Sequence, residues 1–180
     1  MWAAAAAAAV TTPGMVAAQD KQSNSANEKL GVAVVGVRGR GGSHISAFAG
    51  RKDTEILYIC DADSDVGNSK ADGVAKRQRK PKFEADIRKV LEDDSVDIVS
   101  IATPNHWHAL GAIWAIQAGK DVYLEKPVSH NVWEGRQIVE AARKYGRICQ
   151  TGTQSRSNPG MQDVIKALQD GNIGKAQIGR

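Results

Sequence analysis

Cysteine is scarce in this 180-residue sequence, which contains only two, and long apolar runs are missing altogether. The scarcity of cysteine excludes the small disulfide-rich folds of secreted proteins. Cys60 and Cys149 each lie in an apolar run that predicts a strand, where a thiol usually behaves as a small buried hydrophobic group. We therefore expect no disulfide between them. The lack of a long apolar run predicts no transmembrane helix.

The sequence also has only a small excess of positive charge, with a formal net charge of +4. Much of it comes from the basic stretch 76–82, in which no aromatic residues alternate with the charges to stack on bases. We interpret this stretch as a solvated helix end and loop, and we expect no nucleic-acid partner. The overall balance, 42% hydrophobic and 24% charged, is typical of one soluble globular domain.

The first 29 residues differ in composition from the rest. Seven alanines follow Met1-Trp2, and Val16-Ala17-Ala18 supplies the small residues that precede a signal-peptidase cut. A charged n-region is missing, so two interpretations stay open: a leader that starts upstream, such as a twin-arginine leader, or a disordered low-complexity tail. We expect export to the periplasm if the leader is genuine and a cytoplasmic location otherwise. Residues 20–29 have the composition of a linker, and the folded domain is expected over 30–180.

From residue 30 onward, apolar β-branched runs alternate with helical patterns. Residues 30–37 form the apolar run of a buried parallel strand, followed by a glycine-rich turn at 36–42, a helix at 43–49 and a strand at 55–61. Further helices are predicted at 66–79, 85–91, 106–118, 132–145 and 158–169, and further strands at 82–83, 97–102, 121–124 and 147–151. This alternation predicts an α/β fold: a doubly wound, Rossmann-like parallel sheet whose cleft lies beyond the carboxyl ends of the strands.

The first strand-to-helix turn is a candidate pyrophosphate-binding loop. Backbone N–H groups at such a turn, together with the helix N-terminus behind it, bind phosphate oxygens. In the pattern G-x-G-x-x-G, Gly36 and Gly41 fit, but Arg38 replaces the middle glycine, whose missing side chain normally lets the backbone approach the phosphates. The Arg38 guanidinium could contact phosphate instead, and a simple tight turn is the alternative. The candidate cofactor-binding residues here are Gly36, Arg38, Gly39, Arg40 and Gly41.

Asp61 ends the second predicted strand about 25 residues after Gly36, where a carboxylate can accept hydrogen bonds from the adenosine ribose hydroxyls. A 2′-phosphate would be repelled by this carboxylate. The sequence therefore favours NAD over NADP, although Arg38 or Arg40 could offset the repulsion. The alternative interpretation of Asp61 is a helix or turn cap.

Two further segments stand at the carboxyl ends of successive predicted strands. They are Ala102-Thr103-Pro104-Asn105-His106-Trp107-His108 and Gly119-Lys120-Asp121-Val122-Tyr123-Leu124-Glu125-Lys126-Pro127. They resemble the "TPN..H" and "AGK.V..EKP" signatures of Gfo/Idh/MocA oxidoreductases. The order of glycine loop, Asp61 and these two signatures is similar to that family from about Lys29 to the last residue.

The resemblance implies a role for each matched residue. In the family, the lysine of the EKP triplet, here Lys126, hydrogen-bonds the reacting hydroxyl and takes part in proton transfer. The peptide before Pro127 is often cis in the family, which would aim the lysine into the cleft. Glu125 is implied as a contact on the nicotinamide side. The other implied cofactor contacts are Thr103, Pro104, Asn105, His108, Lys126 and Pro127, and Gln154 is expected to line the cleft because it ends the last strand.

A metal site is not expected, because His106 and His108 are two residues apart at a helix start and do not share one helix face. His108 matches the motif histidine, which implies a place beside the cofactor or a hydrogen bond at the helix start.

Family members carry a second α/β domain that supplies substrate contacts, usually a catalytic histidine, and commonly the dimer contact. Residues 174–180 resemble the strand that crosses into that domain, so we expect the sequence to be a fragment or truncated product. The expected activity is that of a nicotinamide-dependent oxidoreductase acting on a sugar, polyol or related hydroxyl compound. This chain alone is expected to bind NAD and to turn over poorly, with any homo-oligomer formed through the missing domain.

Two other functions stay open. One is a non-catalytic NAD-binding module, either a sensor or a remnant. The other is NAD-dependent glycoside cleavage, known among exported relatives, which we rank lower because those relatives tend to depart from the EKP triplet that is intact here.

Overall fold

The computed structural model describes residues 29–172 and 174. The predicted leader and linker, apart from Lys29, and the predicted crossing strand, apart from Gly174, lie outside the described residues.

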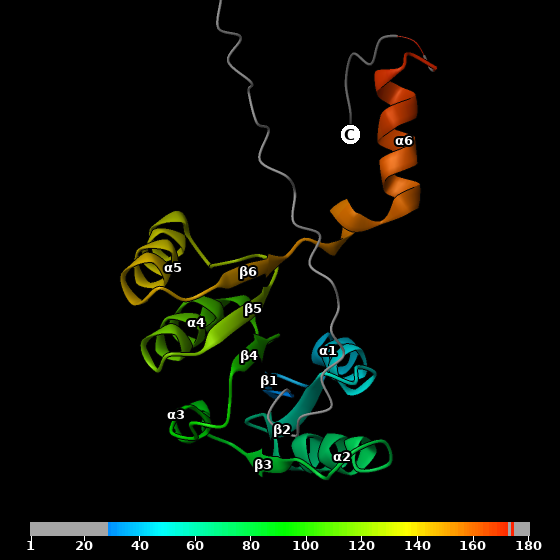
Figure 1. The fold of residues 1–180 in the computed structure, drawn as a ribbon. Coiled ribbons are helices and arrows are strands. Elements are labelled where there is room, and N and C mark those ends of the chain that lie inside the picture. Colours follow the sequence, from blue (N-terminus) through cyan, green and yellow to red (C-terminus); the bar gives the residue numbers. More distant parts are fainter. Residues whose placement is uncertain (1–28, 173, 175–180) are drawn as a thin grey trace, which may run out of the picture.

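Six strands form one parallel sheet in the order β3-β2-β1-β4-β5-β6 (Figure 1). The strands are β1 (Leu30–Val35), β2 (Thr54–Cys60), β3 (Lys82–Glu84), β4 (Ile98–Ile101), β5 (Asp121–Glu125) and β6 (Cys149–Gly152). The chain reverses its direction of travel across the sheet between β3 and β4, so β1 and β4 are neighbours at the switch point where Rossmann sheets bind ligands. The predicted fold class is confirmed.

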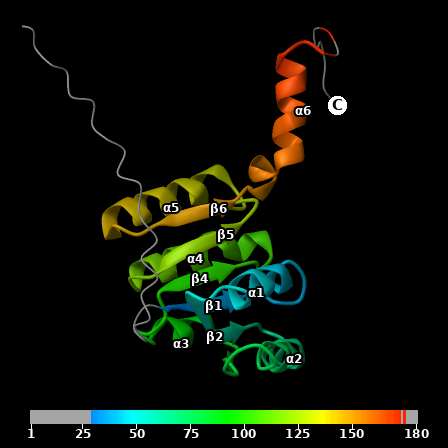
Figure 2. The same ribbon diagram turned by 45° about the vertical axis from the view of Figure 1, so that its right-hand side comes forward.

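Helices connect successive strands and cover both faces of the sheet. They are α1 (Gly41–Ala49), α2 (Ser64–Val74), α3 (Ile87–Leu91), α4 (His108–Gln117) and α5 (Val132–Tyr145), with short 3₁₀ turns η2 (Asn105–Trp107) and η3 (Gln154–Ser157). A last helix, α6 (Pro159–Gln169), extends away from the body of the domain in both views (Figure 2).

The core consists of two apolar clusters, one on each side of β1. Val32 and Val34 pack with side chains of α1 and α2, whereas Ala33 and Val35 pack with side chains of α3, α4 and α5. Because successive residues of a strand point to opposite faces, a strand buried on both faces must be apolar at every position. This explains the continuous apolar run of β1.

The helix boundaries differ from the predicted ones. The helix predicted at 66–79 runs from Ser64 to Val74, because the Asp63 carboxylate accepts from the N–H groups of Asp65 and Val66 and begins the helix earlier. The basic stretch after Val74 leaves the helix and is largely exposed. The helix predicted at 106–118 begins as η2 and becomes α-helical only at His108.

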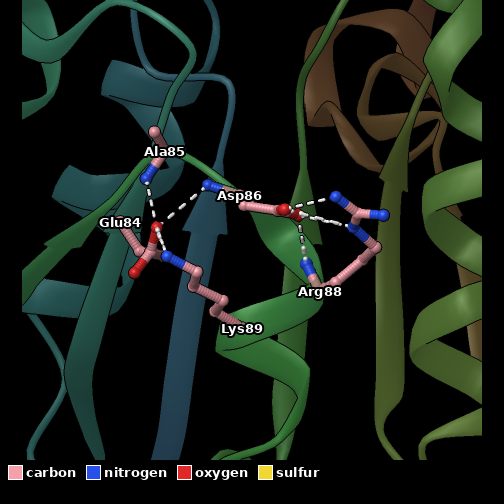
Figure 3. Close-up of polar contacts among 5 residues, drawn as sticks. All are labelled: Glu84, Ala85, Asp86, Arg88 and Lys89. Atoms are coloured by element: carbon pink, nitrogen blue, oxygen red, sulfur yellow. Dashed lines mark hydrogen bonds and ion pairs between the residues drawn. The ribbon is translucent and has the colours of Figure 1, made fainter.

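The turn between β3 and α3 is held by two carboxylates (Figure 3). Glu84 Oε1 accepts from the N–H groups of Ala85 at 2.9 Å and Asp86 at 3.1 Å. Asp86 accepts from the Arg88 N–H and pairs with the Arg88 guanidinium, and these bonds lower the pKa of Asp86 to about 2. A helix of only five residues depends strongly on such a cap.

Candidate functional site

The glycine loop leaves no room for a side chain at two positions, one against the exit of β4 and one within the loop itself. Gly36 has a φ of +80°, and a Cβ there would lie 2.6 Å from the backbone nitrogen of Thr103. A Cβ on Gly41 would lie 2.0 Å from the Gly36 carbonyl oxygen. Only glycine lets the first turn of α1 approach the end of β1 this closely.

The loop leaves a polar surface open at the start of α1. The N-terminus of α1 receives no hydrogen bond from a side chain of the described residues, since Arg40 stands at the capping position. Gly39 has no atom within 4 Å of the place where its Cβ would be. The N–H groups of Gly42 and Ser43 donate to the carbonyl oxygens of Gly39 and Arg40. A helix start that no side chain caps, beside a glycine that leaves space, is still a geometry that favours an anion.

Arg38, at the position of the middle glycine of the motif, points its guanidinium to Asp63 at the start of α2 and forms an ion pair with it. The Arg38 side chain is 73% exposed, so this pair is open to solvent and to a ligand. The pKa of Asp63 lies below its ordinary value, chiefly through the hydrogen bond from the Val66 N–H, with a contribution from Arg38.

Asp61, at the end of β2, joins the two loops that begin α1 and α2. Its Oδ2 accepts from the Val37 N–H at 2.7 Å, and its Oδ1 accepts from the Asp63 N–H at 3.0 Å. The capping interpretation is therefore part of its role. Because a carboxylate oxygen can accept more than one hydrogen bond, the same two oxygens can also accept from a hydroxyl ligand.

The segment after β4 contains an unpaired buried hydroxyl. Thr103 Oγ1 is buried and has no hydrogen-bond partner among the described residues. Pro104 and Asn105, which follow, are exposed at the start of η2. A buried hydroxyl with no partner beside the glycine loop is a feature that a bound polar ligand would satisfy.

His108 joins the exits of β4 and β5. Its Nε2 lies 2.9 Å from the Thr103 carbonyl oxygen and its Nδ1 lies 2.5 Å from the Pro127 carbonyl oxygen. The ring is 2% exposed, whereas His106, two residues earlier, is exposed. The two imidazoles therefore do not converge on a common point.

Glu125, at the end of β5, is the buried centre of the site. Its Oε1 accepts from Arg40 Nε at 2.7 Å and lies 3.3 Å from His44 Nε2, and its Oε2 accepts from the Lys126 N–H at 2.9 Å. Burial on its own would raise the pKa of Glu125, but the hydrogen bonds from Arg40, the Lys126 N–H and His44 hold the pKa below its ordinary value. Glu125 is thus an ionised carboxylate that three protein donors hold in place.

Lys126 and Pro127 follow Glu125 and are exposed, and the peptide between them is cis. At the start of η3, the Gln154 amide lies beside Arg40. In the amide orientation that satisfies both ends, its oxygen accepts from Arg40 Nη2 at 2.6 Å and its nitrogen donates to the Gly152 carbonyl oxygen at 2.7 Å. Arg40 therefore links the glycine loop to the ends of β5 and β6.

Residues 30–153 match the family model described as "Oxidoreductase family, NAD-binding Rossmann fold", that of the Gfo/Idh/MocA proteins. The chain belongs to the Gfo/Idh/MocA oxidoreductase family. Its glycine loop, the Asp61 strand end and the EKP segment lie inside the matched range, so the chain carries the NAD-binding oxidoreductase domain of that family.

Individual relatives show the same relationship. The alpha-N-acetylgalactosaminidase of Shewanella oneidensis is 33% identical over 127 residues, which cover 68% of this chain and 28% of that protein. GenD2 from gentamicin A biosynthesis, solved in complex with NAD, is 28% identical with a TM-score of 0.71, over 80% of this chain and 39% of GenD2. The WlbA dehydrogenase of Chromobacterium violaceum, solved with NADH and UDP-GlcNAcA, is 25% identical with a TM-score of 0.72, over 82% and 42% of the two chains. The chain thus spans less than half the length of each.

In this Gfo/Idh/MocA domain, several of the residues that the sequence predicts for the site contact one another, whereas Arg38 points elsewhere. Arg40, Glu125 and Gln154 meet, and Thr103 and Pro127 are joined through His108. Arg38 instead turns toward Asp63. Sequence reasoning missed His44, Ser100 and Asp63, of which only Asp63 carried a local signal, as an aspartate directly before a helix.

Within residues 29–172 and 174, no group of three or more His, Cys, Asp or Glu side chains is placed to hold a metal ion. Over the same residues, no helix is long and apolar enough to cross a membrane.

Proposed function

We propose that this Gfo/Idh/MocA domain binds NAD in preference to NADP across the carboxyl ends of its strands. The observation that carries the proposal is the Asp61 carboxylate, which lies at the end of β2 and is bonded to the Val37 N–H of the glycine loop. A ribose bound there would donate its hydroxyls to Asp61. Asp63, two residues on, holds the Arg38 guanidinium in an ion pair, which leaves the charge of Asp61 to disfavour a 2′-phosphate.

The residues around Asp61 fit the rest of a dinucleotide. The uncapped start of α1 and the open surface at Gly39 would take the pyrophosphate, with Arg38 and Arg40 as cationic neighbours. Thr103 Oγ1 supplies an unpaired hydroxyl beside the loop. The nicotinamide end would then lie toward Glu125 and Lys126, on the β4–β5 side of the switch point. Nicotinamide cofactors supply hydride acceptance and donation.

Lys126 is the residue that we propose for proton transfer. It is exposed at the cleft, and its own N–H is held by the buried Glu125 carboxylate, which fixes the start of the segment that presents the ammonium group. The substrate that we propose is a sugar or polyol hydroxyl, supported by the sugar nucleotide in the WlbA complex and by the glycosidase name of the Shewanella relative.

Calorimetric titration with NAD and with NADP tests the binding proposal. We expect saturable NAD binding, weaker NADP binding, and a loss of about tenfold or more in NAD affinity in Asp61→Ala, because hydrogen bonds to a charged group are among the stronger ones. Asp94→Ala is the matched control. Asp94 is exposed in the connection before β4, and so lies near the amino end of that strand rather than at the carboxyl ends where we propose that NAD binds. Equal affinities of wild type and Asp61→Ala for NAD would refute the assignment of the ribose site.

A second candidate function is NAD-dependent glycoside cleavage, which the name of the Shewanella relative favours. In such a reaction, the hydride taken up by the cofactor is later returned, so the net reaction is hydrolysis with water.

Turnover assays with sugars, polyols and aryl glycosides distinguish the dehydrogenase from the glycosidase. NADH that accumulates with oxidised sugar supports a dehydrogenase, and aglycone release without NADH supports a glycosidase. In either case Lys126→Met should abolish turnover while NAD still binds. Binding without any turnover, even in a chain lengthened by a second domain of the kind its relatives carry, supports a non-catalytic module.

A further inference from the structure

Behind Glu125 lies a buried histidine that the proposed cofactor contacts do not include. His44, on the first turns of α1, is 5% exposed. Its Nδ1 lies 2.8 Å from Ser100 Oγ on β4 and its Nε2 lies 3.3 Å from Glu125 Oε1 on β5. Its ring also forms a T-shaped pair with the ring of Tyr123, at a centroid distance of 5.3 Å and an interplanar angle of 77°.

The partners of His44 determine which of its nitrogens carries the proton. A carboxylate oxygen only accepts hydrogen bonds, so Nε2, which faces Glu125, must donate. The Ser100 hydroxyl is 0% exposed and can then donate to Nδ1. The neutral Nε2–H tautomer thus satisfies both contacts, whereas the opposite tautomer would place a lone pair against the carboxylate.

The charges around His44 favour its neutral form. Burial lowers the pKa of His44, and the nearby Arg40 lowers it further, while the hydrogen bond and negative charge of Glu125 oppose this shift without reversing it. The groups that face the ring are Ser100, Tyr123, Glu125 and Arg40.

We propose that His44, as its neutral Nε2–H tautomer set by Ser100, is a positioning residue that fixes the Glu125 carboxylate. Glu125 in turn holds Arg40 of the glycine loop and the N–H of Lys126. His44 therefore acts on the nicotinamide half of the cleft through Glu125, without touching the cofactor. This inference rests on the proposed function for its effect on NAD, but the tautomer of His44 is a property of the chain without nucleotide.

The tautomer is measured first. The chain has four histidines, so ¹⁵N-detected imidazole spectra at neutral pH are simple to assign with single variants. We expect a neutral Nε2–H ring for His44, and a smaller fraction of that tautomer in Ser100→Ala, which removes only the orienting hydroxyl. A Nδ1–H tautomer or an imidazolium at neutral pH would overturn the proposal.

Binding then separates positioning from general structural support. His44→Phe keeps an aromatic ring of similar size but removes the donor to Glu125. We expect NAD affinity to fall about tenfold. The affinity for ADP-ribose, whose pyrophosphate depends on Arg40 but which lacks the nicotinamide, should fall clearly less. His44→Gln, whose amide can donate to Glu125, should restore most of the NAD affinity, and His130→Phe, at an exposed position before α5, should change neither.

An equal loss of affinity for NAD and ADP-ribose, or no loss for either, would overturn the positioning role. If the wild-type chain binds neither nucleotide, the proposed function fails, and the tautomer of His44 still decides this inference on its own.

Discussion

Gly41 and Gly39 differ in the space around them, although they are two residues apart in the same loop. A Cβ on Gly41 would lie 2.0 Å from a backbone carbonyl oxygen, whereas a Cβ on Gly39 would meet nothing within 4 Å. One glycine is thus required by the packing of α1 on β1. The other leaves a free surface where the pyrophosphate of the proposed ligand would lie.

Alanine at each position should therefore have opposite consequences. Gly41→Ala is expected to lower the free energy of unfolding by about 2 kcal/mol or more, because the added methyl meets backbone that cannot move aside cheaply. Gly39→Ala should leave the free energy of unfolding within about 0.5 kcal/mol of wild type but weaken NAD binding. Urea unfolding and calorimetric titration of both variants check this. Equal stability of the two variants would contradict the packing account.

Single residues show what a sequence can and cannot predict about the site. Asp61 was predictable because its place at a strand end follows from local pattern alone. Arg38 was predicted as a phosphate contact, but its partner Asp63 lies on another loop. His44 could not be recognised, because its partners Ser100 and Glu125 are 56 and 81 residues away and only the sheet brings them together.

At the scale of elements, the exits of β4 and β5 are joined by one buried side chain at the start of α4. His108 reaches the carbonyl oxygens of Thr103 and Pro127 and is nearly inaccessible to solvent. These two exits carry most of the proposed nicotinamide-side contacts, so His108 couples the stability of the domain to the shape of the cleft.

Replacing His108 with leucine should remove both ring nitrogens, and with them the N–H donor, from beside these two carbonyl oxygens. We expect His108→Leu to lower the free energy of unfolding by about 2 kcal/mol or more and also to weaken NAD binding. His106→Leu, at the exposed neighbouring position, is the control and should stay within about 0.5 kcal/mol of wild type. Thermal and urea unfolding measure the difference. A stable His108→Leu variant with unchanged NAD affinity would show that the two exits do not depend on this link.

The order of elements was predictable and their ends were less so. Continuous β-branched runs such as β1 identify buried parallel strands, and the alternation with helices determines the sheet class. The start of α2 depends instead on one cap at Asp63, and α4 begins later than predicted because η2 precedes it. Hydrophobic periodicity reports neither the side-chain hydrogen bonds that begin α2 nor the 3₁₀ turn that precedes α4, which no side chain caps.

At the scale of the whole molecule, the proposed cofactor site uses the ends of β1, β2, β4 and β5 together with the loop after β6, while the last helix lies apart. The apolar side chains Met161, Val164, Ile165 and Leu168 of α6 are 41–56% exposed. The matched relatives are more than twice as long as the region they share with this chain. Nucleotide binding is therefore the property by which we propose to test this domain.

The central claim is that one dinucleotide spans the cleft from Asp61 to Lys126. A crystal structure of the chain with NAD tests it most directly. We expect the adenosine ribose hydroxyls on Asp61, the pyrophosphate on the N–H groups at the start of α1, and the nicotinamide between Thr103 and Lys126. A dinucleotide bound away from Asp61, or one in the reverse orientation with its nicotinamide beside β2, would contradict the account.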